Sequence, residues 1–130
     1  MQRVDQKTTQ GPFVSVDHVQ LSMPEGEEER ARGFYCGVLG LREVPRPADM
    51  ANRGGAWYAG GAVALHLAVE NPFTPAKKAH PAFVCADYEA LLERLREHAV
   101  EIVPAGLSPE GKARCHVRDP FGNRIELIAG

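Results

Sequence analysis

One order of predicted elements, a strand followed by a helix and three more strands, occurs twice along this chain. In the first half, alternating apolar residues predict strands, and a helical stripe predicts a helix at 25–39; the strands are at 13–22, 41–44, 56–59 and 62–69. The second half has a predicted helix at 88–99 and strands at 80–86, 100–104, 112–118 and 124–128. Such a repeat restricts the fold to two similar modules that bury their apolar faces together.

Length and composition favour one domain of the α+β class. With 130 residues, of which 44% are hydrophobic, the chain can bury a sizeable core. We expect residues 1–12 to form a flexible tail, because they are polar and end in Gly11-Pro12, and 13–130 to form the domain. Within that domain, module one covers about 13–70, a linker 71–79 and module two about 80–129.

Charge and cysteine content narrow the partners and the location. A formal charge of -2 and a pI near 6.2 provide no basic field, so we expect a small-molecule substrate rather than nucleic acid or an anionic membrane. No apolar run approaches the roughly 20 residues of a membrane helix, and residues 1–10 are too polar for a secretion signal. Three cysteines without a CxxC pattern suit packed thiols in a reducing compartment, so we expect a cytoplasmic protein.

Near the end of the chain, a turn leads into a strand that carries one carboxylate. The segment Asp-Pro-Phe-Gly-Asn at 119–123 has the residues that tight turns favour, and the segment 124–128 after it alternates polar and branched apolar side chains. Alternation places Glu126 on one face with Arg124, while Ile125 and Leu127 point to the other. The carboxylate is therefore fixed on rigid backbone opposite the apolar side.

Three histidines lie at positions that match between the repeats. His18 and His80 are 62 residues apart on the first strands, and His66 and Glu126 are 60 residues apart on the last strands. If the modules pack about a pseudo-twofold axis, these four side chains meet and form a site for one divalent ion, with Zn, Ni, Co, Mn and Fe as candidates. Each residue also has a structural explanation, since histidines pack within strands and strand carboxylates are usually solvated.

In these features the chain resembles the vicinal oxygen chelate superfamily, which includes glyoxalase I, extradiol dioxygenases, fosfomycin-modifying enzymes, methylmalonyl-CoA epimerase and bleomycin-binding proteins. The resemblance covers about residues 13–129 and rests on Asp17-His18-Val19, Phe34-Tyr35 with Leu39-Gly40-Leu41, His80-Pro81-Ala82-Phe83, and Asp119-Pro120-Phe121-Gly122-Asn123 leading into Ile125-Glu126-Leu127. It implies two βαβββ modules that form a cup-shaped mixed sheet in pseudo-twofold arrangement, the glyoxalase-like fold. It also implies metal ligation by His18, His66, His80 and Glu126, and a homodimer.

The same resemblance implies a metal-dependent reaction on vicinal oxygens of a small metabolite or xenobiotic. A divalent ion with open positions would polarise an oxygen of the substrate, and Glu126 would act as the catalytic carboxylate that moves a proton, in a lyase or isomerase type of reaction. Glyoxalase I-like members commonly have a carboxylate where this chain has His66, so only Glu126 could serve here. Extradiol dioxygenases resemble it in a set matching His18, His80 and Glu126, which leaves that reaction as an alternative.

A metal-free binding protein of the bleomycin-resistance type is the other alternative. The intact set of four ligands favours the enzyme, because a protein that only sequesters a ligand has no need of them. Four further residues are candidates for substrate contacts: Gln20, Trp57, His116 and Arg124. Gln20 and Arg124 share strand faces with His18 and Glu126, respectively, whereas core packing is the competing explanation for Trp57.

Overall fold

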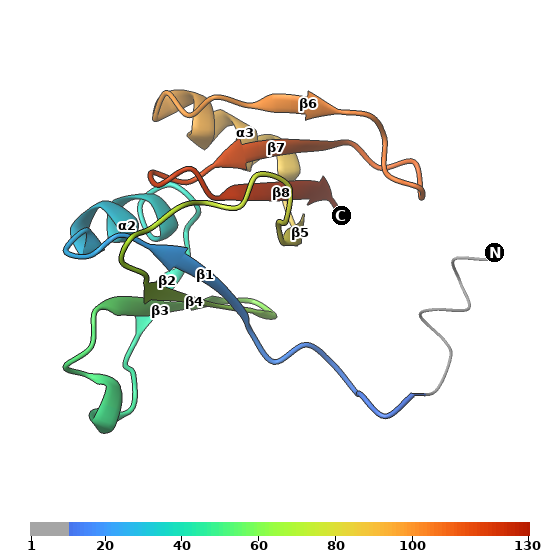
Figure 1. The fold of residues 1–130 in the computed structure, drawn as a ribbon. Coiled ribbons are helices and arrows are strands. Elements are labelled where there is room, and N and C mark those ends of the chain that lie inside the picture. Colours follow the sequence, from blue (N-terminus) through green and yellow to red (C-terminus); the bar gives the residue numbers. More distant parts are fainter. Residues whose placement is uncertain (1–10) are drawn as a thin grey trace.

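A computed structural model describes residues 11–130, so the tail predicted at 1–12 falls almost entirely outside the described residues. The strands form two four-stranded sheets, one from each half of the chain. In each half an α-helix contacts the sheet of that half (Figure 1). This α+β arrangement of two βαβββ modules confirms the predicted fold class.

The first module has one sheet with the strand order β1-β4-β3-β2, in which β1 runs parallel to β4. Its elements are β1 (Val19–Met23), α2 (Glu28–Tyr35), β2 (Arg42–Val44), the short 3-10 helix η1 (Ala48–Met50), β3 (Gly55–Gly60) and β4 (Val63–Val69). A tight turn joins β3 to β4, as the Gly60-Gly61 pair predicts, and Gly61 has a φ of 55° there. Glycine adopts this left-handed conformation without the steric cost of a Cβ atom.

The second module repeats the first, with the strand order β5-β8-β7-β6 and β5 parallel to β8. Its elements are β5 (Ala82–Cys85), α3 (Tyr88–Glu97), β6 (Val103–Ala105), β7 (Arg114–Arg118) and β8 (Arg124–Ala129). The Asp87 side chain caps α3 by accepting a hydrogen bond of 3.1 Å from the backbone N–H of Ala90, which satisfies one free donor of the first turn.

One face of each sheet is buried in the hydrophobic core. The apolar residues of the predicted alternation lie there, including Leu65 and Leu67 on β4 and Ile125 and Leu127 on β8. The core cluster also contains side chains from both helices, namely Phe34 and Tyr35 of α2 and Leu92 and Leu95 of α3. Burying this apolar surface is the main contribution to the stability of the fold.

The opposite face of each sheet, which we call its open face, carries the polar residues of the strands. Residues that pair across neighbouring strands lie on the same face of a sheet, so the register shows which residues share the open face. On the first sheet the open face includes Gln20, Trp57 and His66. On the second sheet it includes Arg114, His116, Arg118, Arg124 and Glu126. The predicted site residues that lie within strands, Gln20, Trp57, His66, His116, Arg124 and Glu126, are therefore on an open face.

The turn at 119–123 fastens the second module to the first. The Tyr35 hydroxyl donates a 2.7 Å hydrogen bond to Asp119 Oδ2, and Asn123 Nδ2 donates to the same oxygen at 2.8 Å. Asn123 Nδ2 also lies 2.8 Å from the Ser22 carbonyl oxygen of the first module, and the backbone N–H groups of Phe121 and Asn123 donate to Asp119 Oδ1. Asp119 and Asn123 are buried, and these hydrogen-bond partners take the place of the water that an exposed polar group would bind.

Several predicted elements are shorter in the structure. The strand predicted at 13–22 begins only at Val19, and the strand predicted at 80–86 begins at Ala82, because Pro81 has no N–H to donate to a neighbouring strand. His18 and His80 thus lie just before their strands rather than in them. The helix predicted at 25–39 ends as an α-helix at Tyr35. Turn-type backbone hydrogen bonds continue to Gly40, which has a φ of 78°.

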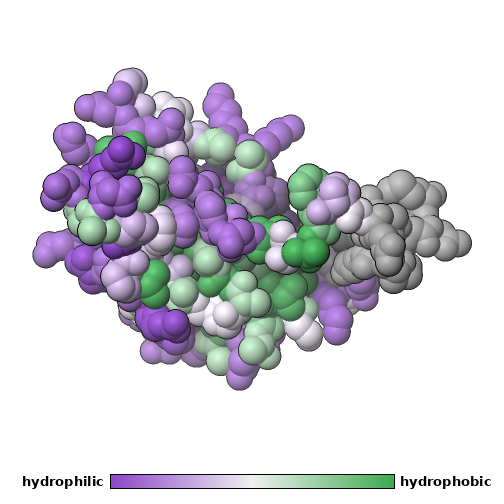
Figure 2. Space-filling view, turned by 90° about the horizontal axis from the view of Figure 1, so that it is seen from below, coloured by the Kyte–Doolittle hydropathy of each residue, from purple (hydrophilic) through white to green (hydrophobic). Residues whose placement is uncertain are grey.

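The segment before β1 extends away from the body of the molecule (Figure 1). Its apolar side chains have little contact with the rest of the chain, since Phe13 is 87%, Val14 100% and Val16 77% exposed. Seen from below, the surface becomes rich in apolar residues toward the end where this segment leaves the body (Figure 2). Among the described residues, no helix combines the length and the apolar character needed to cross a membrane.

Candidate metal and substrate site

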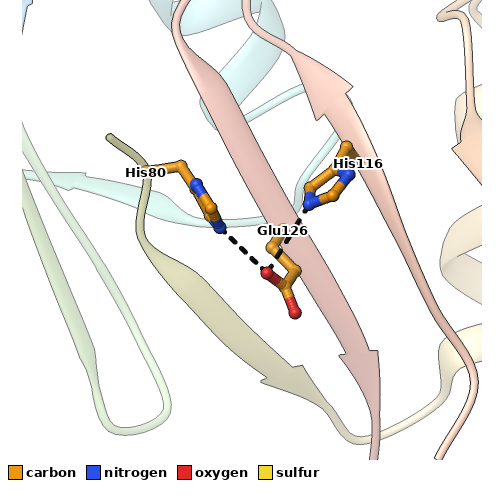
Figure 3. Close-up of side chains that lie close together, drawn as sticks. All are labelled: His80, His116 and Glu126. Carbon is orange, nitrogen blue, oxygen red and sulfur yellow. Dashed lines mark hydrogen bonds and ion pairs between the residues drawn. The ribbon is translucent and has the colours of Figure 1, made fainter. Parts of the chain in front are cut away.

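The second open face brings three potential metal ligands together. His80 Nε2 lies 2.9 Å from Glu126 Oε1, and His116 Nε2 lies 3.6 Å from the same oxygen (Figure 3). β8 holds Glu126 opposite His116 of β7, while His80 approaches from the segment before β5. The backbone carbonyl oxygen of Lys78 fixes the His80 ring through a contact of 2.6 Å with Nδ1, which leaves Nε2 facing the carboxylate.

Glu126 is a buried carboxylate surrounded by nitrogen donors. It is 7% exposed, and its second oxygen accepts a hydrogen bond of 3.3 Å from Arg114 Nη1. Burial alone raises the pKa of this carboxyl group, but the hydrogen bonds from His80 and Arg114 and the charges around them outweigh burial and lower it below its ordinary value. The side chain is therefore ionised at neutral pH, the state in which a carboxylate binds a cation or accepts a proton.

His116 connects this group to a second arginine. Arg124 Nη2 lies 3.2 Å from Nδ1 and 3.3 Å from Nε2 of the His116 ring, so the guanidinium group contacts both ring nitrogens. Burial and the neighbouring Arg124 charge lower the pKa of His116, although Glu126 opposes this effect in part. The imidazole is consequently neutral at neutral pH.

The first open face carries a stack of three rings. The His66 ring lies between those of Trp57 and His18, with centroids 3.9 Å from Trp57 and 4.1 Å from His18. His18 Nδ1 is 2.8 Å from the carboxylate of Asp17, which orients that ring. Burial and the nearby His18 lower the pKa of His66. A neutral imidazole with a free nitrogen lone pair is the form that binds a metal ion.

The predicted ligands are thus divided between two places in one chain. His80 and Glu126 meet, and so do His18 and His66, but each pair lies on its own module. Within residues 11–130, the group of at least three ligand atoms lying within 4.8 Å of one another consists of His80, His116 and Glu126. His116, predicted as a substrate contact, is therefore also placed as a ligand would be.

The remaining predicted substrate contacts lie beside these groups. Gln20 is the cross-strand neighbour of His66, and Trp57 is stacked on it, while Tyr58 next to Trp57 faces the core. Sequence reasoning missed Arg114. The signal was present in the alternation of β7, because Arg114 shares a face with His116, but the register that pairs β7 with β8 was needed to use it.

The donor set fits a divalent cation. Imidazole nitrogens and a carboxylate oxygen suit Zn, Ni, Co, Mn or Fe, and the cysteines take no part in either group. Cys85 and Cys115 are buried, and burial raises the pKa of both thiols, so they behave as packed apolar side chains. The residues of the second open face could hold such an ion, and His18 and His66 would add two more nitrogen donors.

Several cavities lie on the molecule near these elements. One, of about 330 Å³, is lined by His116, Arg118, Arg124, Glu101, Val103 and Val117 and borders the second open face. A larger one, of about 620 Å³, lies where the modules meet and is lined largely by apolar residues such as Leu41, Val63 and Phe83. Polar groups of the site reach the smaller cavity through His116 and Arg124, and Gln20 and His80 line a third cavity of about 520 Å³.

Comparisons with known proteins agree with this architecture. Residues 15–127 match the family model of the glyoxalase/bleomycin resistance protein/dioxygenase superfamily. A solved structure from Bacillus anthracis, described as a glyoxalase family protein, is 38% identical, covers 93% of this chain and 98% of that chain, and has a TM-score of 0.87. A search of curated proteins found no match.

More distant structures share the fold. The fosfomycin resistance protein FosX from Listeria monocytogenes is 16% identical, with a TM-score of 0.67 and coverage of 91% of this chain and 92% of that chain. A lactoylglutathione lyase from Agrobacterium tumefaciens is 19% identical, with a TM-score of 0.66 and coverage of 92% and 96%. The family model, which spans most of the chain, shows that this protein belongs to the glyoxalase/bleomycin resistance protein/dioxygenase superfamily.

Proposed function

We propose that this protein is a divalent-metal-dependent, glyoxalase-like enzyme that acts on a small substrate with vicinal oxygens, in a lyase or isomerase type of reaction. The observation that carries the proposal is Glu126, a buried carboxylate held 2.9 Å from His80 Nε2 and 3.6 Å from His116 Nε2. Burial of an ionised carboxylate costs stability unless it is paired, and side chains kept in such a state often serve a functional site.

A bound ion would supply a Lewis acid that polarises a carbonyl or hydroxyl oxygen of the substrate. The Glu126 carboxylate would accept and return the substrate proton, since its lowered pKa keeps it ionised and ready to accept one. Arg114 holds Oε2 and thereby fixes the orientation of the carboxylate. Gln20, Trp57, His116 and Arg124 contact the substrate from the two open faces.

The complete ligand set requires two copies of the chain in this proposal. His18 and His66 of one copy combine with His80 and Glu126 of a second copy, because within residues 11–130 of one chain the ligand atoms that lie within 4.8 Å of one another include neither His18 nor His66. Exposed apolar side chains of Phe13, Val14 and Val16 support association, since such surface is normally covered by a partner. The expected assembly is a homodimer with two equivalent sites.

One observation favours a second candidate, an extradiol-type dioxygenase. The trio within one chain consists of two histidines and one carboxylate, His80, His116 and Glu126. Two histidines with one carboxylate and open positions are the ligand set of non-haem Fe(II) oxygenases. The proposals differ in the native metal and in whether oxygen is consumed.

Elemental analysis of untagged protein, before and after chelation and reconstitution with single metals, tests the proposal. We expect about one ion per chain, tightly held. The identity of the ion then directs substrate screening: Fe(II) toward oxygen consumption, and Ni, Co or Zn toward isomerisation. Absence of binding under every reconstitution would contradict the metalloenzyme and leave a ligand-sequestering protein of the bleomycin-resistance type.

A further inference from the structure

Two arginines face each other at the end of the second open face. The register of β7 and β8 pairs Arg118 directly with Arg124, next to the pair formed by His116 and Glu126. Directly opposed like charges in an antiparallel pair are destabilising. Two guanidinium groups in this position therefore need a compensating interaction.

No carboxylate supplies that compensation within residues 11–130. Arg118 Nη1 donates to the Gly122 carbonyl oxygen at 2.8 Å, and Arg124 contacts the His116 ring. Neither guanidinium forms an ion pair with a described residue, whereas Arg114 is paired with Glu126 and Arg32 with Glu43.

The same arginines line a cavity. Arg118, Arg124 and His116 border the cavity of about 330 Å³, which is at the lower end of the usual range of ligand sites, roughly 300–1,000 Å³. Glu101 also lines this cavity but is solvent-exposed, so its charge is screened by water. A small anion is the ligand that this arrangement suits, since guanidinium groups bind planar and tetrahedral oxyanions through paired hydrogen bonds.

We propose that the cavity between Arg118 and Arg124 binds an oxyanion group of the substrate, either a carboxylate or a phosphonate or phosphate. Arg124 is two residues from Glu126 on β8, a distance of about 7 Å along the strand. A short molecule could thus place its anionic group at the arginines and its vicinal oxygens beside Glu126. This link to Glu126 rests on the metalloenzyme proposed above, whereas anion binding by the two arginines does not.

NMR titration of the full-length, metal-free protein with inorganic phosphate and, separately, with acetate tests this site. We expect saturable shifts of the backbone amide signals of residues 116–126. Arg124→Gln should weaken the binding by on the order of 10-fold, because it removes charged hydrogen bonds. Arg96→Gln is the matched control, since Arg96 lies on α3 and pairs with Glu93. Arg118→Gln provides a second variant if Arg124→Gln does not fold.

The two probes separate the sources of the anion. Stronger binding of phosphate supports a phosphonate or phosphate substrate, and stronger binding of acetate supports a carboxylate. Absence of saturable shifts with both probes, or equal binding by Arg124→Gln and wild type, would overturn the anion site. Metal content measured on the same samples keeps the two proposals apart: Arg124→Gln should retain the wild-type metal content, and phosphate binding should persist even if wild type binds no metal.

Discussion

The two open faces have the same backbone frame but different chemistry. The first presents stacked rings, with His66 between Trp57 and His18. The second presents a charged network in which Glu126 contacts His80, His116 and Arg114. Two modules can share a strand order and still differ in the side chains of their open faces. Because side chains alternate along a strand, the core residues lie on the opposite face and are unaffected by these differences.

This difference in side chains indicates that the two modules have different roles in the proposed site. The first open face offers nitrogen ligands and a flat apolar surface, which suit metal binding and substrate packing. The second adds the ionised carboxylate and two arginines that form no ion pair within the described part of the chain, which suit proton transfer and anion binding. Neither face alone has all four predicted ligands.

The largest expected effect is the loss of the carboxylate from the second face. Glu126→Gln keeps the size of the side chain and a hydrogen-bonding oxygen but removes the charge. Substituting a residue that only hydrogen-bonds to a metal ligand already lowers metal affinity by about 10- to 100-fold. Loss of a ligand charge should therefore lower metal affinity by on the order of 100-fold or more. Metal titration followed by calorimetry measures this change. Glu43→Gln, at an exposed carboxylate of β2, is the control. Wild-type affinity in Glu126→Gln would remove this residue from the metal site.

A pair of histidine variants sharpens the comparison between the faces. If His66 is a ligand, His66→Ala should weaken metal binding by on the order of 10- to 100-fold. His116→Ala should change metal affinity only a few-fold while raising the KM of the substrate, because His116 contacts substrate in the proposed site. The reverse outcome would assign the ion to the trio of one module, His80, His116 and Glu126.

Two tyrosines test the junction between the modules. Tyr35→Phe removes the hydrogen bond to buried Asp119 and should lower the free energy of unfolding by about 1–2 kcal/mol. Tyr58→Phe is the matched control, because the Tyr58 hydroxyl is buried and has no hydrogen-bond partner among the described residues. Its removal should be neutral within about 0.5 kcal/mol or stabilising. Urea denaturation of both variants measures the difference, and equal losses would contradict it.

The smallest expected effect is on pH dependence. The pKa values of His66 and His116 are lower in the folded chain than the ordinary value of 6.5, so the unfolded chain binds more protons below that pH. Stability of the metal-free protein should therefore fall as the pH drops through about 6.5. Thermal unfolding from about pH 7.5 to about pH 5.5 should show a shallower decline for His66→Asn than for wild type.

Much of the fold followed from local patterns in the sequence. The repeated element order, the buried sides of β4 and β8 and the Asp87 cap depend on neighbours a few residues away, which sequence patterns record. Strand ends were less predictable. The segment 13–18 alternates like a strand, but a strand needs a partner, and this segment has none among residues 11–130 of the chain.

The candidate site was predictable only in part, for a related reason. The repeat spacing pointed to His18, His66, His80 and Glu126, and their metal binding stays a prediction. The place of His116 next to Glu126 depends on the register that the turn at 119–123 imposes, and Arg114 follows from that same register. How the two pairs of ligands come together depends on packing between modules or copies, which alternation within a strand does not encode.

Metal content of a heterodimer tests the joint site most directly. One variant carries His18→Ala with His66→Ala, the other carries His80→Ala with Glu126→Ala, and different affinity tags allow the mixed dimer to be isolated after co-expression. Each variant alone should bind no metal. Because the mixed dimer has one site in which both halves are intact, it should bind about one ion, half the wild-type content. A mixed dimer without metal, or a failure of the chains to associate, would contradict a site built from two copies.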